Sequence, residues 1–357
     1  MKRRNFNMAA VTMAVTTTAW ARKPAPRPPP GPINVVAKIK ALRVTSGPLT
    51  NGYRIAPGGI LNWYFINLGL IPIIQYLNAA DLDLYIRPYI DLYLQRLESN
   101  NTIQDVHFND ANAQTFTAVL SDSDNSYAAT LLSLVARYLR ASNNWAWWDA
   151  NKSKLKAIAY DNIATLIKSN GLCRVFQYTR SSPVANYGYM MNNAEDYRGL
   201  KDFAALLRLR GESADADYYG NFATTIGRSI GLYLWDSGRN GFKISDQDSR
   251  ADPSTFYPGT TCQVFPQAFD VSEVSVNFTA AYNFLNTYSP RWPSEVYDPF
   301  PWAILGYVAA KRGDLTRAQT QISATQTKYA SEPGLVTINE LGFYQRTQSI
   351  LNGYGDI

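Results

Sequence analysis

Two neighbouring apolar segments differ in how their side chains are distributed around a helix, and this difference constrains the fold strongly. From Tyr127 to Leu139, in "YAATLLSLVARYL", apolar residues occupy nearly every side of a helix, which predicts a buried helix. In the next segment Leu155, Ile158 and Ile163 recur at helical spacing with lysines between them, which predicts a surface helix with one buried stripe. A buried helix followed by a half-exposed one predicts a helical hairpin with an inner and an outer member.

The same reading extends along the chain and predicts an all-α protein. Gly211, Gly313 and Asp314 mark helix boundaries. The stretch 237–270 is rich in Gly, Asp, Ser and Pro and is expected to be irregular or to hold a short β-hairpin. Ten helices are predicted, at about 58–77, 80–98, 124–141, 146–169, 193–210, 213–235, 272–288, 298–311, 314–329 and 338–351.

Helical hairpins of this kind close into a ring or stack into a solenoid. An α-solenoid requires a repeat of fixed period, and the sequence shows none. We therefore expect one ring of helical hairpins, an (α/α)6-toroid-like domain, over residues 33–357.

The first 32 residues have the composition of a leader and a linker. "KRRNF" is a charged start, Met8 to Trp20 is mildly apolar, and Ala19-Trp20-Ala21 has the small-x-small pattern of a cleavage site. Arg3 and Arg4 also fit a twin-arginine signal, and the ordinary secretory route stays open. We expect an export signal at 1–21, a stiff Pro-rich linker at 22–32, and a periplasmic or secreted protein.

The net charge of +6 comes from this leader. Residues 1–32 hold six basic side chains and no acidic ones, and removing these six from the 34 basic residues leaves 28, equal to the 28 acidic residues. A neutral body has no electrostatic footprint for nucleic acid, so we expect no nucleic-acid partner. The apolar part of the leader is too short and too polar for a membrane span. No integral membrane segment is expected, and the protein is expected to be a monomer.

Cysteine and histidine are scarce. Cys173 and Cys262 could form one disulfide in an exported protein or remain two buried thiols. The single histidine, His107, is expected in a loop after the second helix and has no "GxSxG" elbow with it. Two cysteines and one histidine do not suffice for a His- or Cys-rich zinc centre, and we expect neither a metal nor another cofactor.

Polar residues gather at the starts of four predicted helices. If inner helices begin at one end of a ring, these residues share one cleft. The starts are "SDSDNS" with Asp122 and Asp124, "NNAED" with Asn193, Glu195 and Asp196, "YDPFPW" with Asp298 and Trp302, and "INELGFY" with Glu340.

Two of these stretches resemble glycoside hydrolase family 8, a six-hairpin (α/α)6-toroid family. "SDSDNSYAATLL" is similar to its Ser-Asp-x-Asp motif at an inner-helix start, and "VYDPFPWAILG" to a later Tyr-Asp stretch. The resemblance covers about a tenth of the chain. It implies that Asp122 grips the sugar at the cleavage point, that Asp124 is its helix-start neighbour, and that Asp298 is the general base.

The family's general-acid glutamate has no counterpart here. Its place, at the start of the first inner helix, reads "APGGILNWYF" with Gly58-Gly59. The wider resemblance is therefore to the six-hairpin glycosidase superfamily. Glycoside hydrolysis needs a carboxylic acid and a carboxylate on either side of the bond, so another acid has to be found. Glu195 is the first candidate for the acid and Glu340 the second.

The sequence thus predicts an exported, inverting glycoside hydrolase acting on a β-glucan or bacterial exopolysaccharide. Tyr187, Tyr189 and Trp302 are expected to stack on sugar rings, and Asp124, Asn193, Asp196, Tyr197 and Glu340 to complete the binding site. Single aspartates at helix starts are also good caps, so a purely structural role for Asp122 or Asp124 stays open. Two other functions stay open: a catalytically silent glycan-binding toroid, and a polysaccharide lyase using Tyr187, Tyr189, Asn192 and Asn193.

Overall fold

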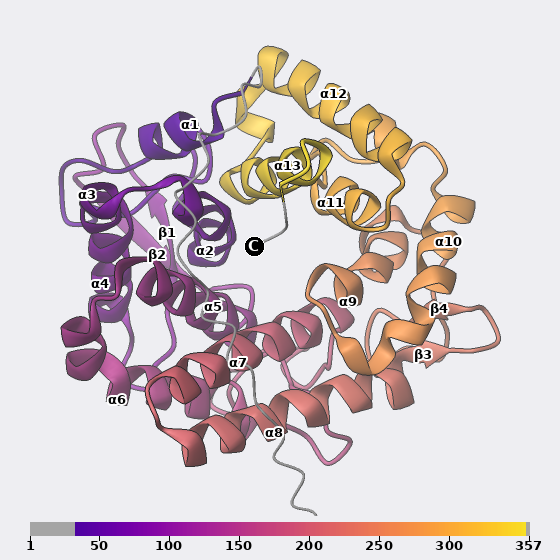
Figure 1. Cartoon of the computed structure of the whole chain (residues 1–357), viewed down its shortest axis with the longest axis horizontal. Helices are drawn as coiled ribbons and strands as arrows, with labels where there is room; N and C mark the ends of the chain where they lie inside the picture. The colour runs from indigo at the N-terminus through magenta and orange to yellow at the C-terminus, as the bar shows by residue number, and fades with distance from the viewer. Residues whose placement is uncertain (1–32, 355–357) are drawn as a thin grey trace, which may run out of the picture.

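The computed structural model describes residues 33–354, which form a closed ring of helices in two layers (Figure 1). The predicted signal at 1–21 and linker at 22–32 lie outside the described residues, as do the last three residues. The all-α toroid expected from the alternation of buried and half-exposed helices is confirmed, including irregular structure and a short hairpin around 237–270.

The inner layer contains six helices that contact one another in chain order, and the last contacts the first and closes the ring. These helices are α2 (Trp63–Ile73), α5 (Asn125–Ser142), α7 (Met190–Leu209), the short α9 (Phe265–Ala268), α11 (Ile304–Lys311) and α13 (Ile338–Leu351).

The outer layer covers the inner one. Helix α1 precedes the first inner helix and packs against the last, so the two ends of the described chain complete the sixth hairpin. The outer helices are α1 (Val35–Ala41), α4 (Arg87–Arg96) with the short α3 (Ala79–Asp81) before it, α6 (Trp145–Asn162), α8 (Ser213–Ser229), α10 (Phe278–Tyr288) and α12 (Leu315–Ser331). Single turns of tighter or wider helix lie at 74–76, 82–86, 164–166, 230–234, 256–260, 261–264, 272–277, 292–294 and 333–335.

Helix composition decides which layer each helix joins. Helix α5 buries fourteen of its eighteen residues and α2 buries nine of eleven, because their apolar side chains point in all directions. Helix α6 buries only one stripe, with Leu155 and Ile158 in it. Gly211 and Gly313 end α7 and α11 at φ values of +77° and +79°, which only glycine adopts without strain, and confirm the predicted boundaries.

Two inner-ring contacts require glycine for a different reason. A Cβ atom on Gly199 of α7 would lie 2.5 Å from the backbone oxygen of Ala129 on α5, and one on Gly69 of α2 would lie 2.6 Å from the backbone oxygen of Ile338 on α13. The missing side chains let the helix backbones approach closely. These two glycines therefore hold the ring together at the α5–α7 contact and at its closure.

Two antiparallel hairpins interrupt the helices. Strands β1 (Asp105–Phe108) and β2 (Phe116–Val119) pair with His107 opposite Thr117, so the loop position predicted for His107 is wrong. Only two of the four residues of β2 are even partly buried, and such short strands carry no alternation to detect. Strands β3 (Trp235–Asp236) and β4 (Gly241–Phe242) form the second hairpin.

Two predicted helix starts also differ from the structure. Helix α5 begins at Asn125, one residue after the predicted start, with Asp124 as its N-cap. Helix α11 begins at Ile304, and Asp298 lies in the preceding bend because Pro299 and Pro301 interrupt the segment. Helices α1 and α9 were not predicted, because both are very short.

Candidate active site

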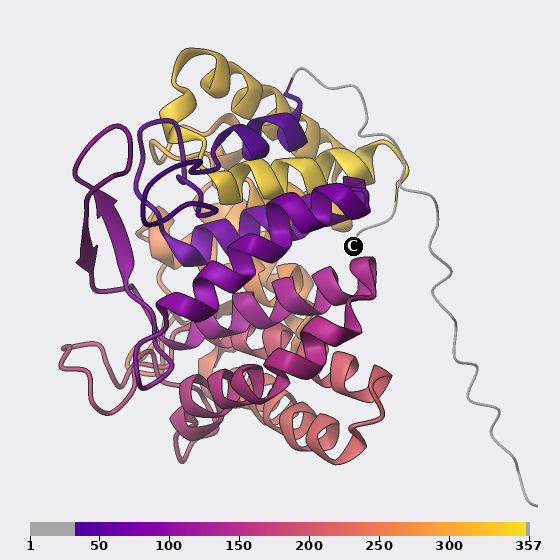
Figure 2. The same cartoon turned by 90° about the vertical axis from the view of Figure 1, so that its left-hand side faces the viewer.

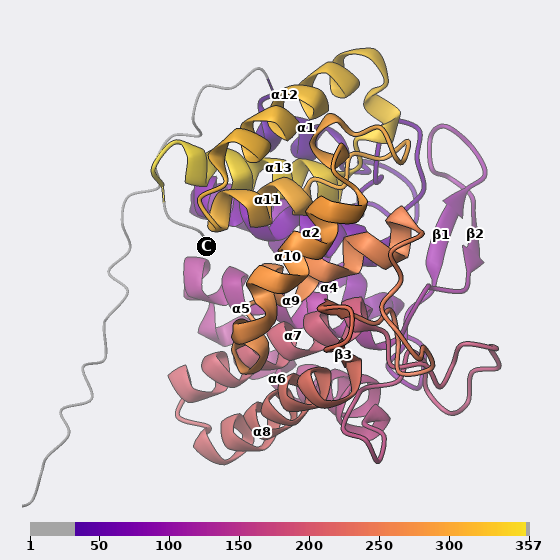
Figure 3. The same ribbon diagram turned by 90° about the vertical axis from the view of Figure 1, so that its right-hand side faces the viewer.

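The inner helices begin at one end of the ring, and their first residues touch. The Asn62 side chain before α2 donates to Tyr127 of α5 (2.7 Å), and Asn125 of α5 donates to Asp196 of α7 (2.8 Å). The Ala303 amide before α11 donates to Glu340 of α13. Hairpin β1–β2 stands beyond this end, as Figures 2 and 3 show from opposite sides. The predicted convergence of helix starts is therefore present.

Tyr257 also lies at this end, beside the start of α11. Its ring stacks on Trp302 with centroids 4.8 Å apart, and about half of the side chain is exposed (54%). Burial of the hydroxyl raises the pKa of Tyr257, and the charges of Asp122, Glu195 and Asp298 raise it further. The charges of the three carboxylates assigned catalytic roles from the sequence thus all reach one tyrosine hydroxyl. We call Asp122, Glu195 and Asp298 the carboxylate cluster.

Asp122 is the exposed member of the carboxylate cluster. It lies between β2 and α5, and its side chain makes no hydrogen bond or ion pair with the rest of the described chain. Partial burial raises its pKa, and its charge in turn raises the pKa of the neighbouring Asp105 and Tyr127. A carboxylate left free at the surface of a polar site is available to a ligand.

Asp298 is partly buried in the bend before α11. One carboxylate oxygen accepts the Phe300 amide at 2.8 Å, which fixes the side chain over the backbone turn. Its charge helps to raise the pKa of Glu340. The second oxygen of Asp298 has no bond to another described residue and is available to a water molecule or a hydroxyl.

Glu195 is the buried member, in the second turn of α7 with 3% of its surface exposed. Burial raises the pKa of this carboxyl to about 7, opposed by the hydrogen bond that the Tyr64 hydroxyl donates to it. A carboxyl with this pKa is substantially protonated at neutral pH and can donate a proton. Burial, and next the charge of Glu195, raise the pKa of the Tyr64 hydroxyl, so this group stays a donor.

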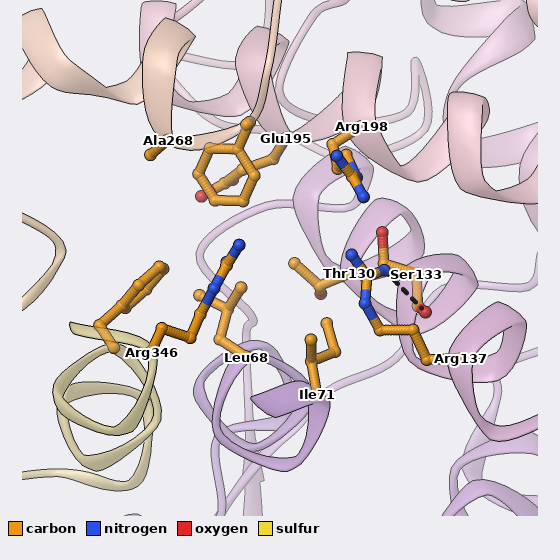
Figure 4. Close-up of a pocket in the computed structure, with 11 residues that line it drawn as sticks. Leu68, Ile71, Thr130, Ser133, Arg137, Glu195, Arg198, Ala268 and Arg346 are labelled. Atoms are coloured by element: carbon orange, nitrogen blue, oxygen red, sulfur yellow. Dashed lines mark hydrogen bonds between the residues drawn. The ribbon is translucent and has the colours of Figure 1, made fainter. Parts of the chain in front are cut away.

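On its other side Glu195 lines a small cavity on the ring axis, shown in Figure 4. Its volume of about 20 Å³ suits one water molecule. Arg137 and Arg198 point into the cavity and share Asp202, whose pKa they lower to about 2 despite its burial. The ring axis behind Glu195 is therefore filled and positively charged.

A buried layer under the carboxylate cluster was not predicted from the sequence. Tyr64 stacks on Tyr127 (centroids 5.8 Å apart), and the Tyr127 hydroxyl donates to Asp105 at 2.6 Å. Asp105 also accepts from Asn62 (2.7 Å) and from the Trp63 amide (3.1 Å). Burial raises its pKa to about 7. These contacts fix the start of α2, and with it Tyr64, beside Glu195.

Five predicted binding residues have polar atoms engaged by the protein itself. Asp124 binds the Gln177 amide (2.9 Å) and Arg180 and so holds the loop after residue 175. Asn193 bonds to both backbone groups of Cys173. Asp196 accepts from Asn125, Tyr197 bonds to Ser272, and Glu340 accepts from the Ala303 amide. For all five residues a sugar-binding role stays a prediction.

The three predicted stacking residues differ in position. Tyr187 and Tyr189 pack on each other with centroids 5.6 Å apart, and Tyr189 lies close enough to Tyr257 for the two hydroxyls to interact. Trp302 has a positive φ of 53°, which carries its ring to Tyr257. Its buried indole N–H has no acceptor within the described chain. Tyr257 and Trp302 together form an aromatic platform next to the carboxylate cluster.

The remaining chemistry-bearing residues lie elsewhere. Cys173 and Cys262 are both buried free thiols, so the alternative of a disulfide is excluded in this structure. Residues 33–354 contain no group of three or more His, Cys, Asp or Glu side chains placed to hold a metal ion. Within the same range no helix is both long and apolar enough to cross a bilayer.

Tyr257, Tyr64 and Asp105 are the site residues that sequence reasoning missed. Tyr257 lies in "FYPGTT", an irregular stretch with no periodicity, and Asp105 lies in a four-residue strand. Tyr64 does stand in the first turn of an inner helix. Treating every polar side chain in such a turn as a candidate would have found Tyr64, and nothing in the sequence marks the other two.

The comparisons with known proteins identify the fold. No protein-family model matches the sequence, and no curated protein matches it. A rhamnosidase from Klebsiella oxytoca, solved with rhamnose bound, aligns over 92% of this chain at 13% identity and a TM-score of 0.57. The chain spans 66% of that protein, slightly under two thirds. A glycosidase variant with a glutamate-to-alanine substitution aligns over 90% of this chain and 96% of its own, at 11% identity and a TM-score of 0.55. The chain thus has the six-hairpin toroid fold found in these glycosidases.

Proposed function

We propose that this protein is an exported glycoside hydrolase that cleaves a polysaccharide, either a β-glucan or a bacterial exopolysaccharide. The observation that carries the proposal is that the charges of Asp122, Glu195 and Asp298 all reach the Tyr257 hydroxyl, whose ring stacks on Trp302 in an aromatic platform. Glycoside hydrolysis needs two carboxyl groups held in different protonation states, together with a surface that stacks on sugar rings. The toroid fold shared with two glycosidases is consistent with this chemistry.

In this proposal Glu195 is the general acid. Its burial keeps the carboxyl protonated near neutral pH, so it can give its proton to the glycosidic oxygen as the bond breaks. The Tyr64 hydroxyl donates to one oxygen of the Glu195 carboxyl, which leaves the other oxygen to carry the proton that is transferred. Glu340 remains the second candidate acid, since its pKa is also raised to about 7 by burial.

Asp298 is the general base and Asp122 grips the sugar at the cleavage point. Asp298 is held by the Phe300 amide and keeps one oxygen for the attacking water. A base that activates water gives inversion at the anomeric carbon, for which the acid and base stand roughly 6.5–9.5 Å apart. Asp122 has free carboxylate oxygens that can accept hydrogen bonds from sugar hydroxyls. These roles follow the resemblance to family 8, with Glu195 in place of its missing glutamate.

The test is a panel of three isosteric variants and one control. Asp122→Asn, Asp298→Asn and Glu195→Gln are assayed for reducing ends on β-glucans and exopolysaccharides, alongside their melting temperatures. Asp217→Asn, an exposed aspartate of outer helix α8, is the matched control. We expect the three variants to lose activity by about 100-fold or more while the control does not. Full activity of Asp122→Asn and Asp298→Asn would overturn the assignment. Loss in those two alone would move the acid to Glu340.

The lyase alternative is less well supported by the geometry. A lyase would need a tyrosine or asparagine as its base. Burial and the neighbouring charges raise the pKa of Tyr257, which opposes formation of a phenolate. Asn193 is buried and bonded to Cys173, and Asn192 donates to Asn125. Ultraviolet absorption by an unsaturated product would nevertheless identify a lyase in the same assay.

A catalytically silent glycan-binding toroid has one observation in its favour. The proposed acid is only 3% exposed and is bonded to Tyr64 in the described conformation. A silent protein would retard on glycan-containing gels and release no reducing ends from any substrate of the panel.

Export through the leader is the last part of the proposal. A mature protein beginning near Ala21 or Arg22 should be found outside the cytoplasm. Replacing Arg3 and Arg4 by lysine blocks export if the route is twin-arginine, and unchanged export leaves the ordinary secretory route.

A further inference from the structure

A second pocket lies outside the carboxylate cluster, between α1, α12 and the loop that precedes α2. Figure 1 shows α1 beside α12 and α13 at this part of the ring. The volume of the pocket, about 360 Å³, falls within the roughly 300–1,000 Å³ of small-molecule sites. Its walls include Lys38, Arg43, Arg54 and Tyr329. We call this space the α1–α12 pocket.

The charge of the α1–α12 pocket has one sign. Three of its lining residues are cationic and none is acidic. Within residues 33–354, Lys38, Arg43 and Arg54 make no ion pair, whereas Lys40 of the same helix is paired with Asp81 at 2.7 Å and does not line the pocket. Three cations that share a concave wall without a counter-charge favour an anionic ligand.

The two arginines are held in place without being neutralised. Arg54 donates to the backbone oxygens of Gly59 and Ala111 (both 3.0 Å) and lies 4.1 Å from the ring centroid of Phe108. Arg43 donates to Asn51 and lies over the Tyr85 ring, and its buried Nε has no acceptor within the described chain. Neutral partners fix these guanidinium groups and leave their charge for a ligand, so little ordering is needed on binding.

The rest of the pocket suits a sugar ring. Tyr329 of α12 is partly buried, and the Lys38 ammonium lies 5.6 Å from its ring centroid. The floor is apolar, made of Leu42, Val336 and Leu341, all at most 9% exposed. A tyrosine face over an apolar floor binds the flat, half-polar face of a saccharide, and arginine binds carboxylate through charge-assisted hydrogen bonds.

We propose that the α1–α12 pocket is a binding site for an acidic saccharide unit, a uronate whose carboxylate meets Arg43, Arg54 and Lys38. The choice of a saccharide rests on the proposed function, while the anionic character rests on the pocket alone. The site would hold an acidic residue of the polysaccharide away from the carboxylate cluster. A glycan with acidic units is then the substrate class to expect.

The test measures binding directly and needs no catalysis. Tri-galacturonate is titrated by calorimetry into the full chain, into Lys38→Ala and Arg43→Ala, and into Lys154→Ala. Lys154 is an exposed lysine of outer helix α6, far from the pocket, and is the charge-matched control. We expect each pocket variant to weaken binding by roughly tenfold, as for loss of one charge-assisted hydrogen bond, and the control to bind normally. Lys38 is exposed, so its variant stays informative even if Arg43→Ala unfolds.

Two further probes distinguish a uronate site from a general anion site. A neutral trisaccharide should bind weakly and should not respond to Lys38→Ala. Inorganic phosphate that displaces tri-galacturonate at equal concentration would overturn the saccharide assignment. Absence of tri-galacturonate binding, or equal binding by both pocket variants and the wild type, would overturn the site itself.

The outcome is separable from that of the proposed function. Asp298→Asn should abolish cleavage and leave tri-galacturonate binding to the pocket unchanged. Binding lost in Asp298→Asn but intact in Lys38→Ala would place the uronate at the carboxylate cluster and refute the pocket. Binding that depends on Lys38 in a protein that cleaves no glycan would keep the pocket and refute the hydrolase.

Discussion

Gly199→Ala is a direct test of how the inner ring is packed. An alanine Cβ at this position would lie 2.5 Å from the Ala129 backbone oxygen and 2.6 Å from its Cα. Because the obstacle is backbone of the adjacent helix α5, no side-chain rotation relieves it, and α5 and α7 have to separate. Overpacking of this kind costs about 1–3 kcal/mol, and we expect the upper end here.

The substitution also has a favourable component. Alanine stabilises a helix interior relative to glycine by about 1 kcal/mol. The net loss expected for Gly199→Ala is therefore about 2 kcal/mol. The matched control is Gly220→Ala in α8, where the new Cβ would meet only Ala204 at 3.8 Å, an ordinary contact. This variant should gain about 1 kcal/mol from helix propensity alone.

Thermal unfolding separates the two variants. For a folded unit of about 320 residues, 1 kcal/mol corresponds to roughly 1.5 °C in Tm. We expect a fall of about 3 °C for Gly199→Ala and a rise of about 1.5 °C for Gly220→Ala, by circular dichroism and calorimetry. A Gly199→Ala protein as stable as the wild type would show that the α5–α7 contact is looser than described.

Three further predictions concern titrating groups. Tyr64→Phe removes a hydrogen bond that favours the ionised form of Glu195, so the pKa of Glu195 should rise and the alkaline fall of activity should move to higher pH; an unmoved profile would refute Glu195 as the acid. Asp202→Asn leaves Arg137 and Arg198 without their shared carboxylate and should destabilise the protein by about 3–5 kcal/mol at pH 7. This difference from the wild type should shrink as the pH falls from about 4 toward 2, because Asp202 itself becomes protonated there. Four buried carboxyl groups have pKa values of about 7 in the folded state: Asp105, Glu195, Glu295 and Glu340. Folding therefore takes up protons between about pH 4.5 and 7, and Tm should be higher at pH 5.5 than at pH 8.5. The reverse order would contradict these four shifts.

The layers of the fold could be predicted because each layer has its own periodicity. A helix such as α5, apolar on all sides, can only be an inner member, and α6 with its lysines can only be an outer one. The sequence predicted that the ring closes, but it did not predict which residues make the closing contact. That contact involves Gly69 and Ile338, which are distant in sequence, and no local pattern reports such a pairing.

The centre of the candidate site could not be predicted in the same way. Tyr257 lies in an irregular stretch, and its position depends on stacking with Trp302, whose backbone has a positive φ in a proline-rich bend. Asp105 reaches the start of α2 only because strand β1 pairs with Leu61, just before that helix. Both placements depend on tertiary contacts, and propensity rules describe only local structure.

The two aspartates of "SDSDNS" show what distinguishes a structural carboxylate from an available one. Both stand at the start of α5, and from composition alone they are equivalent. Asp124 is buried, and the Gln177 amide and the Arg180 guanidinium occupy its carboxylate, so it anchors a loop.

Asp122 is exposed and bonds to no other side chain within residues 33–354, yet its charge reaches Tyr257 and Asp105. Folding does not use this carboxylate, and its charge acts on the same tyrosine hydroxyl as the charges of Glu195 and Asp298. Asp122→Asn should therefore change the free energy of unfolding by no more than about 0.5 kcal/mol. Asp124→Asn should lower that free energy by more, because Arg180 loses its buried partner. Equal losses of stability in the two variants would mean that Asp122 supports the fold as Asp124 does.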